Sequence, residues 1–556
     1  MIKRIIGISF ITGLFLTSCS TSKVEVEQTK KEIKTNSKQP FVWNGANVYF
    51  LLIDRFNNGN TKNDVNYGRT AETAKLRGFE GGDFKGISQK IDENYFSDLG
   101  INAIWMTPIV EQIHGAVNEG QGNTYGFHGY WTKDWTAIDK NWGSEKEFQE
   151  MVEKAHAKGI RIMLDAVINH TGPATDVDGV FPSDWVRVSP QCTYESYKMT
   201  TACTLVKNLP DILTESEKDV MLPPQLLAKW SQEGRLDKEV AELNAFFAKY
   251  NLPKAPKYYI MKWLSDYIRK YGVDGYRVDT VKHTEEEVWK KFAVICQDAF
   301  TEYKANNPSK VLDQNKFFLL GEVYNYTINE AQNFSFPDKK VNYFENGFDA
   351  LINFDLRSSQ KESYQSLFKR YNDILHNKMN GKTVMSYITS HDDGSPFDKN
   401  RQNPWDAGTR LLLAPGISQV YYGDETARPL EIEGVEGDAN LRSFMNWENI
   451  QPNSDTESLL THYQKLGQFR RNHPAVGAGV QTDLQNDPYV FLRKYNNDEV
   501  IIALGYFQTQ KMFTVTNLWK DGTKVRDFYS GATSVVKDGK IVMDIDTETV
   551  LLERID

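Results

Sequence analysis

Two charged residues with the spacing of a catalytic pair, Arg277 and Asp279, lie within the short, mostly apolar run Gly275-Tyr276-Arg277-Val278-Asp279. Side chains alternate along a strand, so the arginine and the aspartate would point to the same face. A buried arginine beside an aspartate favours the ionised carboxylate, which can then act as a nucleophile at neutral pH. Taken alone, however, such a pair is more often a structural ion pair.

Polar groups also end three other apolar runs of the sequence. They are Glu322, the pair His391 and Asp392, and the pair Asn169 and His170. Together with Asp279, this arrangement supplies three carboxylates if the runs are parallel strands whose carboxyl ends meet. Four such runs with the same pattern favour a catalytic site over a purely structural ion pair.

The elements that would position these groups alternate between strand-like and helix-like segments. No Gly-x-Gly-x-x-Gly turn follows the first strand, so the pattern favours a (β/α)8 TIM barrel over a doubly wound sheet. In such a barrel the carboxyl ends of the strands form the active-site face. The predicted strands are residues 48–53, 103–107, 161–167, 275–279, 317–323, 350–354, 384–389 and 417–422, and the predicted helices include 145–158, 258–271 and a long one from residue 285.

Two further domains are predicted around the barrel. The segment between the third strand and the helix at 258–271 is too long for a simple loop, which indicates a small inserted domain. After His473-Pro474, short alternating runs are separated by Asn-Asn-Asp and Asp-Gly turns, a pattern typical of an antiparallel β-sandwich. We therefore assign the barrel to residues 41–170 and 256–472, the inserted domain to 171–255 and the C-terminal β domain to 473–556.

The N-terminus predicts export with a lipid anchor. A cationic start is followed by an apolar stretch too short to span a bilayer and then by Leu16-Thr17-Ser18-Cys19, which resembles a bacterial lipobox. The resemblance implies a signal peptide at residues 1–19 and lipidation of Cys19, with residues 20–40 as a flexible polar tether. The alternative is an ordinary secretory signal with an incidental cysteine. The favoured location is the periplasmic side of the outer membrane, with the cell surface as the other possibility.

The composition of the chain limits the classes of partner that it is expected to bind. The chain has 65 basic and 74 acidic residues, a net charge of −9, and no long basic cluster, which argues against nucleic acid and against a polybasic membrane surface. A neutral partner fits better. In an exported protein Cys192 and Cys203 are candidates for a disulfide that closes a short loop, and Cys296 is expected to be a buried apolar side chain.

The polar motifs resemble a known enzyme family. Four segments are similar to ordered signature regions of the α-amylase superfamily of glycoside hydrolases, family 13, and Leu209-Pro210-Asp211 resembles a fifth. The four are Asp165-x-x-x-Asn169-His170, Gly275-Tyr276-Arg277-Val278-Asp279-x-x-Lys282-His283, Gly321-Glu322-Val323 and His391-Asp392. The likeness runs from about Val48 into the C-terminal β domain and is strongest to bacterial periplasmic α-amylases.

The resemblance implies an endo-acting, retaining hydrolysis of α-1,4-glucosidic bonds in starch, maltodextrins or related α-glucans. Such enzymes use a carboxylate nucleophile and a second carboxyl group about 5 Å away that alternates between acid and base. By position, Asp279 is the expected nucleophile, Glu322 the general acid/base and Asp392 the group that stabilises the distorted sugar. Arg277 is expected to hold Asp279. The family often has asparagine where Ser390 stands, which leaves contacts near the cleavage point open.

The same resemblance implies a set of sugar-binding residues. His128, His170 and His391 match positions that hydrogen-bond the sugar in the reactive subsite, Tyr130 would give it a stacking face, and Lys282 would reach the sugar beyond the cleaved bond. A buried structural histidine and an exposed lysine are the competing interpretations. Four tryptophans could also stack on glucose rings, although core packing is the default for each: Trp131, Trp135, Trp142 and Trp405.

Calcium, bound through hard oxygen ligands, is implied at two sites. The first would use Asn169, Asp211 and the backbone carbonyl of His283, and it would fasten the inserted domain to the barrel. The second would use Asn58, Asn60, Asn63, Asp64, Gly81 and Asp83. An Asn/Gly-rich turn without metal is the competing interpretation of the second site.

Two other functions stay open at this stage. An α-glucan transglycosylase would use the same intermediate with a sugar hydroxyl in place of water. A catalytically silent, lipid-tethered glucan-binding protein should have lost at least one catalytic carboxylate, whereas this chain keeps all three. In each case the expected partner is an α-glucan, the chain is expected to be a monomer, and lipid at Cys19 is the only expected contact with a membrane.

Overall fold

The computed structural model describes residues 39–555. The predicted signal peptide, Cys19 and all but the end of the predicted tether lie outside the described residues. Within residues 39–555, no helix is both long enough and apolar enough to cross a bilayer.

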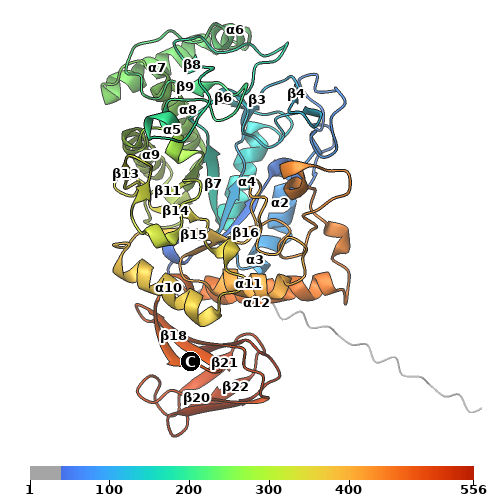
Figure 1. The fold of residues 1–556 in the computed structure, drawn as a ribbon, viewed down its shortest axis with the longest axis vertical. Coiled ribbons are helices and arrows are strands. Elements are labelled where there is room, and N and C mark those ends of the chain that lie inside the picture. Colours follow the sequence, from blue (N-terminus) through green and yellow to red (C-terminus); the bar gives the residue numbers. More distant parts are fainter. Residues whose placement is uncertain (1–38, 556) are drawn as a thin grey trace, which may run out of the picture. The chain divides into compact units, whose positions relative to one another are not determined.

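Eight parallel strands close into a barrel in the order β1-β16-β15-β14-β11-β10-β7-β2 (Figure 1). Each of the eight strands predicted from the sequence is present, which confirms the TIM-barrel prediction. Every residue of these strands is buried, as expected for a parallel sheet covered on both faces. Their bounds are β1 Asn47–Leu51, β2 Ala103–Met106, β7 Arg161–Ala166, β10 Gly275–Val278, β11 Phe318–Gly321, β14 Ala350–Asn353, β15 Thr383–Tyr387 and β16 Ile417–Tyr421.

Helices surround the barrel (Figure 1). α8 shows how local sequence sets their ends: it begins at Pro256 and stops before Gly272, which adopts φ +70°. A Cβ at Gly272 would lie 2.1 Å from the ring of Tyr303, so only glycine fits there. The helices outside the inserted segment are α1 Ile53–Phe56, α2 Phe84–Asp92, α3 Tyr95–Asp98, α4 Glu145–Ala157, α8 Pro256–Tyr271, α9 Glu286–Asn306, α10 Tyr364–Asn377, α11 Pro404–Leu413, α12 Asp455–Asn472 and α13 Ala475–Ala478.

Two excursions leave the barrel at the carboxyl ends of β2 and β7. The first holds β3 Val110–Gln112, β4 Val117–Asn118, β5 Asn123–Thr124 and β6 Thr132–Ile138; β3 pairs with β6. The second is the predicted insertion and holds β8 Val186–Arg187, β9 Asp211–Ile212, α5 Lys198–Thr201, α6 Pro224–Gln232 and α7 Leu236–Tyr250. A third, shorter hairpin, β12 Phe334–Ser335 with β13 Lys340–Val341, follows β11.

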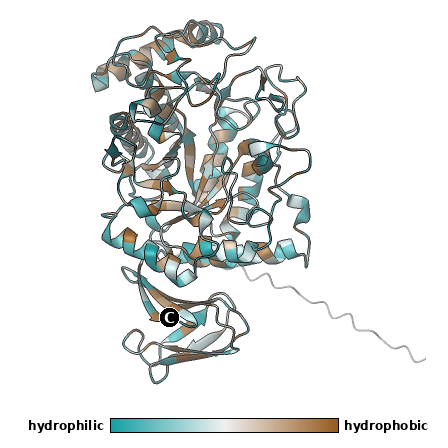
Figure 2. Ribbon diagram, in the orientation of Figure 1, coloured by the Kyte–Doolittle hydropathy of each residue, from teal (hydrophilic) through white to brown (hydrophobic). Residues whose placement is uncertain are grey.

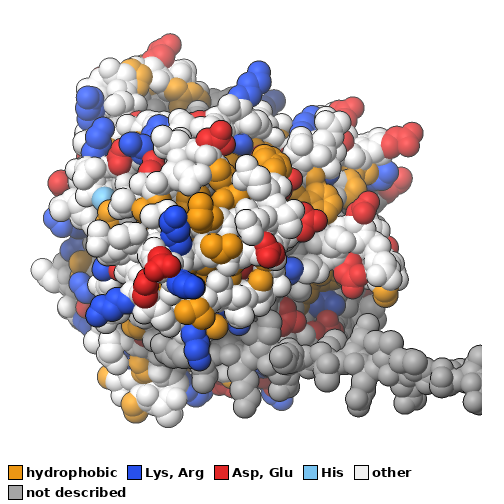
Figure 3. Space-filling view, turned by 90° about the horizontal axis from the view of Figure 1, so that it is seen from below, with side chains coloured by type: hydrophobic (Ala, Val, Ile, Leu, Met, Phe, Trp, Pro, Cys, Tyr) orange, Lys and Arg blue, Asp and Glu red, His pale blue; other side chains and the backbone are white. Residues whose placement is uncertain are grey.

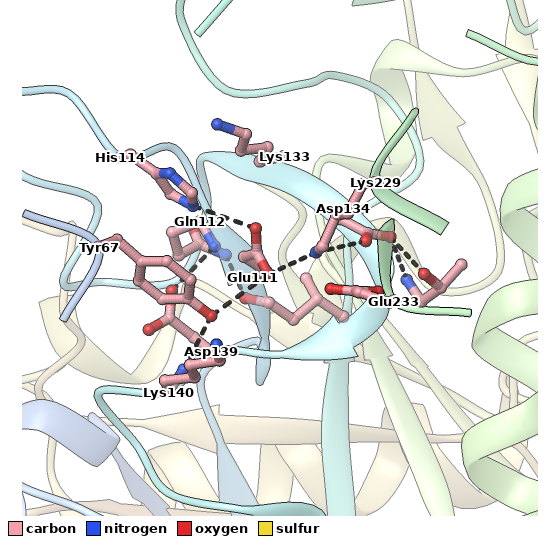
Figure 4. Close-up of polar contacts among 12 residues, drawn as sticks. Tyr67, Glu111, Gln112, His114, Lys133, Asp134, Asp139, Lys140, Lys229 and Glu233 are labelled. Atoms are coloured by element: carbon pink, nitrogen blue, oxygen red, sulfur yellow. Dashed lines mark hydrogen bonds and ion pairs between the residues drawn. The ribbon is translucent and has the colours of Figure 1, made fainter. Parts of the chain in front are cut away.

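The insertion contains a disulfide and a buried anchor. Cys192 and Cys203 are bonded, as the sequence suggested, and Cys296 is free and buried in α9. The anchor is Lys229 of α6, whose Nζ lies 2.5 Å from Glu111 and 2.7 Å from Asp134 (Figure 4). Glu111 and Asp134 are buried on β3 and β6, so the lysine that they share offsets part of the free-energy cost of burying both carboxylates. It thereby fixes the inserted helices to the first excursion.

The C-terminal region is antiparallel, as predicted. A six-stranded sheet in the order β17-β18-β19-β24-β21-β22 and the antiparallel pair β20-β23 enclose a separate apolar core. The ribbon of this region carries both brown and teal segments in Figure 2. Arg493 of β18 donates to the carbonyl of Leu413 in α11, and this bond ties the sheet to the barrel. The strands are β17 Val480–Gln485, β18 Tyr489–Tyr495, β19 Asp498–Leu504, β20 Gln510–Thr514, β21 Lys524–Asp527, β22 Thr533–Val535, β23 Lys540–Asp544 and β24 Val550–Arg554.

The face drawn in Figure 3 carries acidic, basic and apolar side chains in mixture, and neither sign forms a broad field on it. This agrees with the modest net charge of −9 and with the absence of a long basic cluster in the sequence.

Candidate active site

Arg277 is the centre of the polar cluster at the carboxyl end of the barrel strands. Its Nη1 lies 2.9 Å from Asp165 and 2.8 Å from Asp279, and its Nη2 lies 2.8 Å from Glu322. The guanidinium is almost completely buried, with only 1% of the side chain exposed. One cation therefore faces three carboxylates, where sequence analysis had expected it to hold one.

Strand register explains this convergence. Arg277 of β10 lies opposite Asp165 of β7, and β10 pairs on its other side with β11, whose last residue precedes Glu322. The strands β10 and β11 end at Val278 and Gly321, slightly earlier than predicted, so Asp279 and Glu322 are the first residues beyond them. The carboxylates thus sit on the loops of the active-site face, held by rigid strands.

Glu322 is in a position to carry a proton. Burial raises its pKa, the cation of Arg277 opposes that rise, and the charges of Asp279 and Asp392 add to it, so that the pKa of Glu322 reaches about 8. The backbone N–H of Thr280, which has φ +48°, donates to Glu322 Oε2 at 2.9 Å and fixes the carboxyl group. A carboxyl group of this kind is protonated at neutral pH and can act as a general acid.

Asp392 is the most accessible of the three expected catalytic carboxylates, with 34% of its side chain exposed. Burial raises its pKa, but the neighbouring His391 and Arg277 outweigh that effect and lower it overall. Ser390 donates to Asp392 Oδ1 at 2.8 Å, so the serine that replaces the family's usual asparagine orients this carboxylate. The next residue, Asp393, forms an ion pair with Arg357 and accepts a hydrogen bond from the Tyr387 hydroxyl.

Tyr130 lies next to two of the predicted histidines. Its ring centroid is 5.8 Å from that of His128 and 5.3 Å from that of His391, both nearly parallel, and its hydroxyl donates to Asp165 at 2.9 Å. His170 Nε2 lies 3.1 Å from the backbone oxygen of Tyr130. Burial lowers the pKa of all three histidines, to about 4 for His391, so they are neutral and can exchange hydrogen bonds with hydroxyl groups.

Lys282 lies apart from this cluster. Its Nζ donates to the backbone oxygen of Tyr324 at 3.3 Å and lies 5.5 Å from the ring of Tyr194 and 5.3 Å from that of Tyr324. Tyr194 and Tyr324 are both exposed. The lysine therefore has neighbours on the protein, and its contact with the sugar beyond the cleaved bond stays a prediction.

Sequence reasoning gave no role to three residues of the cluster: Asp165, Trp105 and Arg442. Trp105 Nε1 donates to Asp165 Oδ2 at 3.2 Å, and burial raises the pKa of Asp165 to about 7 despite Arg277. Arg442, in the 3-10 helix Gly437–Arg442, donates to the backbone oxygen of His391 at 2.9 Å. The strand-end position of Asp165 was a usable signal, whereas nothing in the sequence near Arg442 connects it to a site about fifty residues upstream.

The three ligands expected for the first calcium site converge. Asn169 Nδ2 lies 2.8 Å from Asp211 Oδ1 and 3.0 Å from the backbone oxygen of His283. Asp211 Oδ2 is paired with Arg187 at 2.7 Å, yet burial still raises the pKa of Asp211 to about 8. The Asn169 amide nitrogen lies where the Asp211 and His283 oxygens meet, and a 180° turn of that amide would present three oxygens together, a set that fits a hard cation.

The residues expected for the second calcium site also lie together. Asn58 Nδ2 lies 3.0 Å from Asp64, and a Cβ on Gly81 would be 2.8 Å from Asp64 Oδ1, so all three are in contact. Asn63 Oδ1 and Asp83 Oδ2 are buried and have no hydrogen-bond partner among the described residues. Asn60 is less involved, since its side chain caps the N–H of Lys62 in the turn. Orphaned buried oxygens are what a hard cation would satisfy.

Comparison with known proteins identifies the family. Residues 50–446 match the model of the alpha amylase catalytic domain. The periplasmic alpha-amylase of Escherichia coli K12 is 33% identical over 527 residues, covering 84% of this chain and 73% of that protein. A cyclomaltodextrin glucanotransferase of Geobacillus stearothermophilus is 26% identical, covering 93% of this chain and 66% of that protein.

Solved structures share the fold. An Anoxybacillus alpha-amylase has a TM-score of 0.63 at 24% identity, covering 93% of this chain and 100% of that one. A gamma-CGTase from alkalophilic Bacillus clarkii has a TM-score of 0.65 at 19% identity, covering 92% of this chain and 71% of that one.

Replacing Arg277 by glutamine tests its central position. We expect kcat/KM to fall by about 100-fold or more, because Asp279 and Glu322 lose the guanidinium that holds their carboxyl groups in position. Since Arg277 lowers the pKa of Glu322, the basic limb of the residual pH profile should move to higher pH. Stability should fall by about 3–5 kcal/mol, because the buried acidic side chains lose the cation that they share. The pH profile of kcat/KM and urea unfolding measure these effects.

The matched control is Arg370→Gln, which removes a partly exposed arginine that pairs with Asp355 and Glu362 outside the site. It should change neither kcat/KM nor the pH profile. Near-normal activity of Arg277→Gln with an unshifted basic limb would show that the cation does not organise the cluster.

Proposed function

The chain belongs to the α-amylase family of glycoside hydrolases, and we propose that it hydrolyses internal α-1,4-glucosidic bonds of starch-type glucans or maltodextrins with retention of configuration. The observation that carries this proposal is the contact of one buried arginine with Asp165, Asp279 and Glu322. It brings an expected nucleophile and an expected general acid onto one cation.

In the first step, the Asp279 carboxylate attacks the anomeric carbon and forms a covalent β-glycosyl ester, while Glu322 gives its proton to the departing glycosidic oxygen. Support for this step comes from the raised pKa of Glu322, which keeps it protonated at neutral pH. The ionised Asp392 would stabilise the positive charge that develops on the sugar ring.

In the second step, the ionised Glu322 removes a proton from water, which attacks the anomeric carbon and releases Asp279. The product then has the α configuration, and both carboxyl groups return to their starting states. Neutral His128, His170 and His391 would hold the hydroxyls of the sugar, with Tyr130 against its face.

Transglycosylation is the second candidate. Similarity over 93% of the chain to a protein named cyclomaltodextrin glucanotransferase favours keeping it. There a sugar hydroxyl would replace water in the second step, and the exposed Tyr194 and Tyr324 beside Lys282 could receive that acceptor.

The proposal predicts the time course of products from amylose. Long chains should disappear early, with newly formed ends in the α configuration, and Asp279→Asn and Glu322→Gln should each lower kcat by about 100-fold or more. Chain-length chromatography and proton NMR of the anomers measure both.

Longer products at high oligosaccharide concentration would identify transglycosylation instead. Full activity of Asp279→Asn would exclude the assigned nucleophile. Starch binding by the native chain without any cleavage would support the silent glucan-binding protein.

We also propose that calcium fills both oxygen sites. The first would fasten Asp211 of the insertion to Asn169 and His283 of the barrel, and the second would hold the turn at 58–64 against Gly81 and Asp83. When bound, the ion supplies positive charge and fixed geometry to these loops, and no step of the reaction uses it. Its effect on catalysis would be indirect, through the shape of the cleft.

Calcium should therefore stabilise the chain. A chelator should lower the thermal unfolding midpoint by several degrees, and added calcium should restore it, because an ion that binds only the folded state stabilises by mass action. Asn63→Ala and Asp211→Asn should each remove part of this response. Calorimetric scans with and without calcium measure it. An unfolding midpoint that does not respond to calcium would contradict both sites.

Finally, we propose that the protein is an exported lipoprotein anchored through Cys19. Two observations support this: the lipobox-like segment ending at Cys19, and the similarity to a protein named periplasmic alpha-amylase.

In a bacterial host, the native chain should partition with membranes and incorporate labelled palmitate. Cys19→Ser should lose the label, while Cys296→Ser should keep it, because Cys296 is buried in α9. Fractionation and fluorography test this. A chain that carries no label and is found only in soluble fractions would indicate an ordinary secretory signal.

A further inference from the structure

A pocket of about 140 Å³ lies at the amino-terminal end of the barrel strands, opposite the catalytic cluster. Asn102 directly precedes β2 and Arg161 is the first residue of β7, whereas the catalytic residues follow the last residues of their strands. The lining contains three arginines, Arg161, Arg470 and Arg471, and no acidic side chain. The volume is roughly ten times the minimum that one water needs, so an ion of several atoms fits.

Two of these arginines have no carboxylate partner within residues 39–555. Arg471 donates to the backbone oxygens of Ile101 at 3.1 Å and Lys158 at 2.9 Å. Arg470, which is 1% exposed, also donates only to backbone oxygens, those of Ala46, Leu412, Ala414 and Gly416. Carbonyl groups solvate a guanidinium without cancelling its charge, so both positive charges lack a counter-ion.

The third arginine does not relieve this excess of positive charge. Arg161 Nη2 pairs with Asp313 at 2.5 Å, which neutralises only Arg161 itself. Burial lowers the pKa of Arg471, and the nearby charge of Arg161 lowers it further. Asp498, the first residue of β19, is paired with His473 instead. Like charges held together in a partly dehydrated place favour the binding of an anion among them.

Donor groups that have no acceptor also line the pocket. Asn102 is 7% exposed, and its Oδ1 accepts from the backbone N–H of Asn47 at 2.8 Å. Its Nδ2 has no acceptor among the described residues, and the same is true of Arg471 Nε. Unlike Arg161 Nε, which is unpartnered and sealed, neither atom is fully buried. A nearly buried amide whose donor stays free is a place for a ligand oxygen.

One wall of the pocket is the segment at residues 39–42, through which the chain enters the barrel. The guanidinium carbon of Arg161 lies 3.7 Å from the centre of the Phe41 ring, which covers one face of that group. Since the N–H groups point outward in the guanidinium plane, this stacking leaves an edge available to an anion. Trp43 stacks on Phe318, the first residue of β11, with centroids 4.2 Å apart. These contacts fix the wall, so the pocket is preformed.

We infer that this pocket binds a tetrahedral oxyanion of the phosphate type. Its negative charge offsets the charges of Arg470 and Arg471, and its oxygens accept from Asn102 Nδ2, Arg471 Nε and the free edge of Arg161. Guanidinium groups bind phosphate oxygens through paired, charge-assisted hydrogen bonds, which gives the site its preference for this class of ion. The site is separate from the catalytic cluster and takes no part in the reaction.

Two sources carry this chemistry: the phosphate group of a membrane phospholipid and a free phosphate ester. Phospholipid is within reach if the chain is anchored as proposed, because Gln39 is only 20 residues from Cys19 and a chain of that length spans at most about 70 Å. In that case the amino-terminal end of the barrel faces the membrane and the catalytic end faces away. The lipid source rests on the proposed anchor, whereas the anion site itself does not.

Calorimetric titration of glycerol 1-phosphate into the full chain, at constant ionic strength, tests the site. One saturable binding event per chain is expected. Arg471→Gln should weaken it by at least tenfold. Asn102→Asp should abolish it, because the new carboxylate keeps the acceptor for Asn47 but places a negative charge in the positive pocket. The same Asn102→Asp change should raise the thermal unfolding midpoint in the absence of added anion.

The matched control is Arg370→Gln, which removes a partly exposed arginine of α10 that is already paired with Asp355 and Glu362. It should leave the titration unchanged. All three variants should keep their kcat on a short chromogenic maltoside, because none of these side chains contacts the catalytic cluster.

Flotation of the Cys19→Ser chain with phosphatidylglycerol vesicles distinguishes the two sources. Flotation that the further change Asn102→Asp abolishes identifies the lipid phosphate as a ligand. A normal titration without flotation identifies a free phosphate ester, and the anion site stands in both cases. Flotation that Asn102→Asp does not alter overturns the lipid source.

The anion site is overturned if glycerol 1-phosphate does not bind, or if Arg471→Gln and Asn102→Asp both leave its binding unchanged. A lowered unfolding midpoint of Asn102→Asp without anion contradicts the excess of positive charge. Failure of the palmitate labelling would remove the proposed anchor and the lipid source, but it would leave the titration and the amylase assignment as they are.

Discussion

The active site depends on one buried guanidinium that must be shared by three carboxylates. Burying a cation is costly unless it is paired, and burying several acidic side chains near one another is costly unless a cation or a proton neutralises part of their charge. Burial of Arg277 is tolerated because Asp165, Asp279 and Glu322 surround its guanidinium. Burial of these three acidic side chains is tolerated in turn because the guanidinium lies among them. The pairing demands that β7, β10 and β11 lie side by side and in register, which the closed parallel barrel provides.

The same arrangement gives the carboxyl groups of the cluster different pKa values and therefore different protonation states. Each carboxylate feels the same cation but a different degree of burial and a different set of neighbours. Glu322, enclosed and close to two other acids, keeps its proton to about pH 8, whereas Asp392, more exposed and next to His391, has a lowered pKa. A protonated Glu322 and an ionised Asp392 are the states in which the proposed mechanism uses them, as the general acid and as the group that stabilises positive charge on the sugar. The chemistry follows from unequal environments around a shared charge.

The insertion is coupled to this centre by polar contacts at two places. On one side, Asp211 meets Asn169 and the carbonyl of His283, directly behind the catalytic loops. On the other, Lys229 joins Glu111 and Asp134 of the excursion that also carries His128 and Tyr130. The substrate-facing loops are thus held by buried charges, which lose much of their value if one partner is displaced.

The sequence by itself determined the eight barrel strands, the insertion and the antiparallel C-terminal region, and it placed Asp279, Glu322 and Asp392 at strand ends; the catalytic roles expected for them came from the family resemblance. It could do so because strand period, apolar runs and strand-end polar residues are local properties of the chain. Arg277 and Asp279 were placed on one face by alternation alone, and their 2.8 Å contact confirms it.

Only the tertiary structure decided which distant groups share a charge. That Arg277 also holds Asp165 and Glu322 and that Arg442 reaches His391 are contacts between segments far apart in the sequence. The unpartnered Arg161 Nε is equally invisible in the chain, because satisfaction of a hydrogen bond depends on every neighbour of the donor. The local sequence pattern determines where the strands and helices form. Burial of charged groups and their pairing across the barrel determine which side chains can take part in the chemistry.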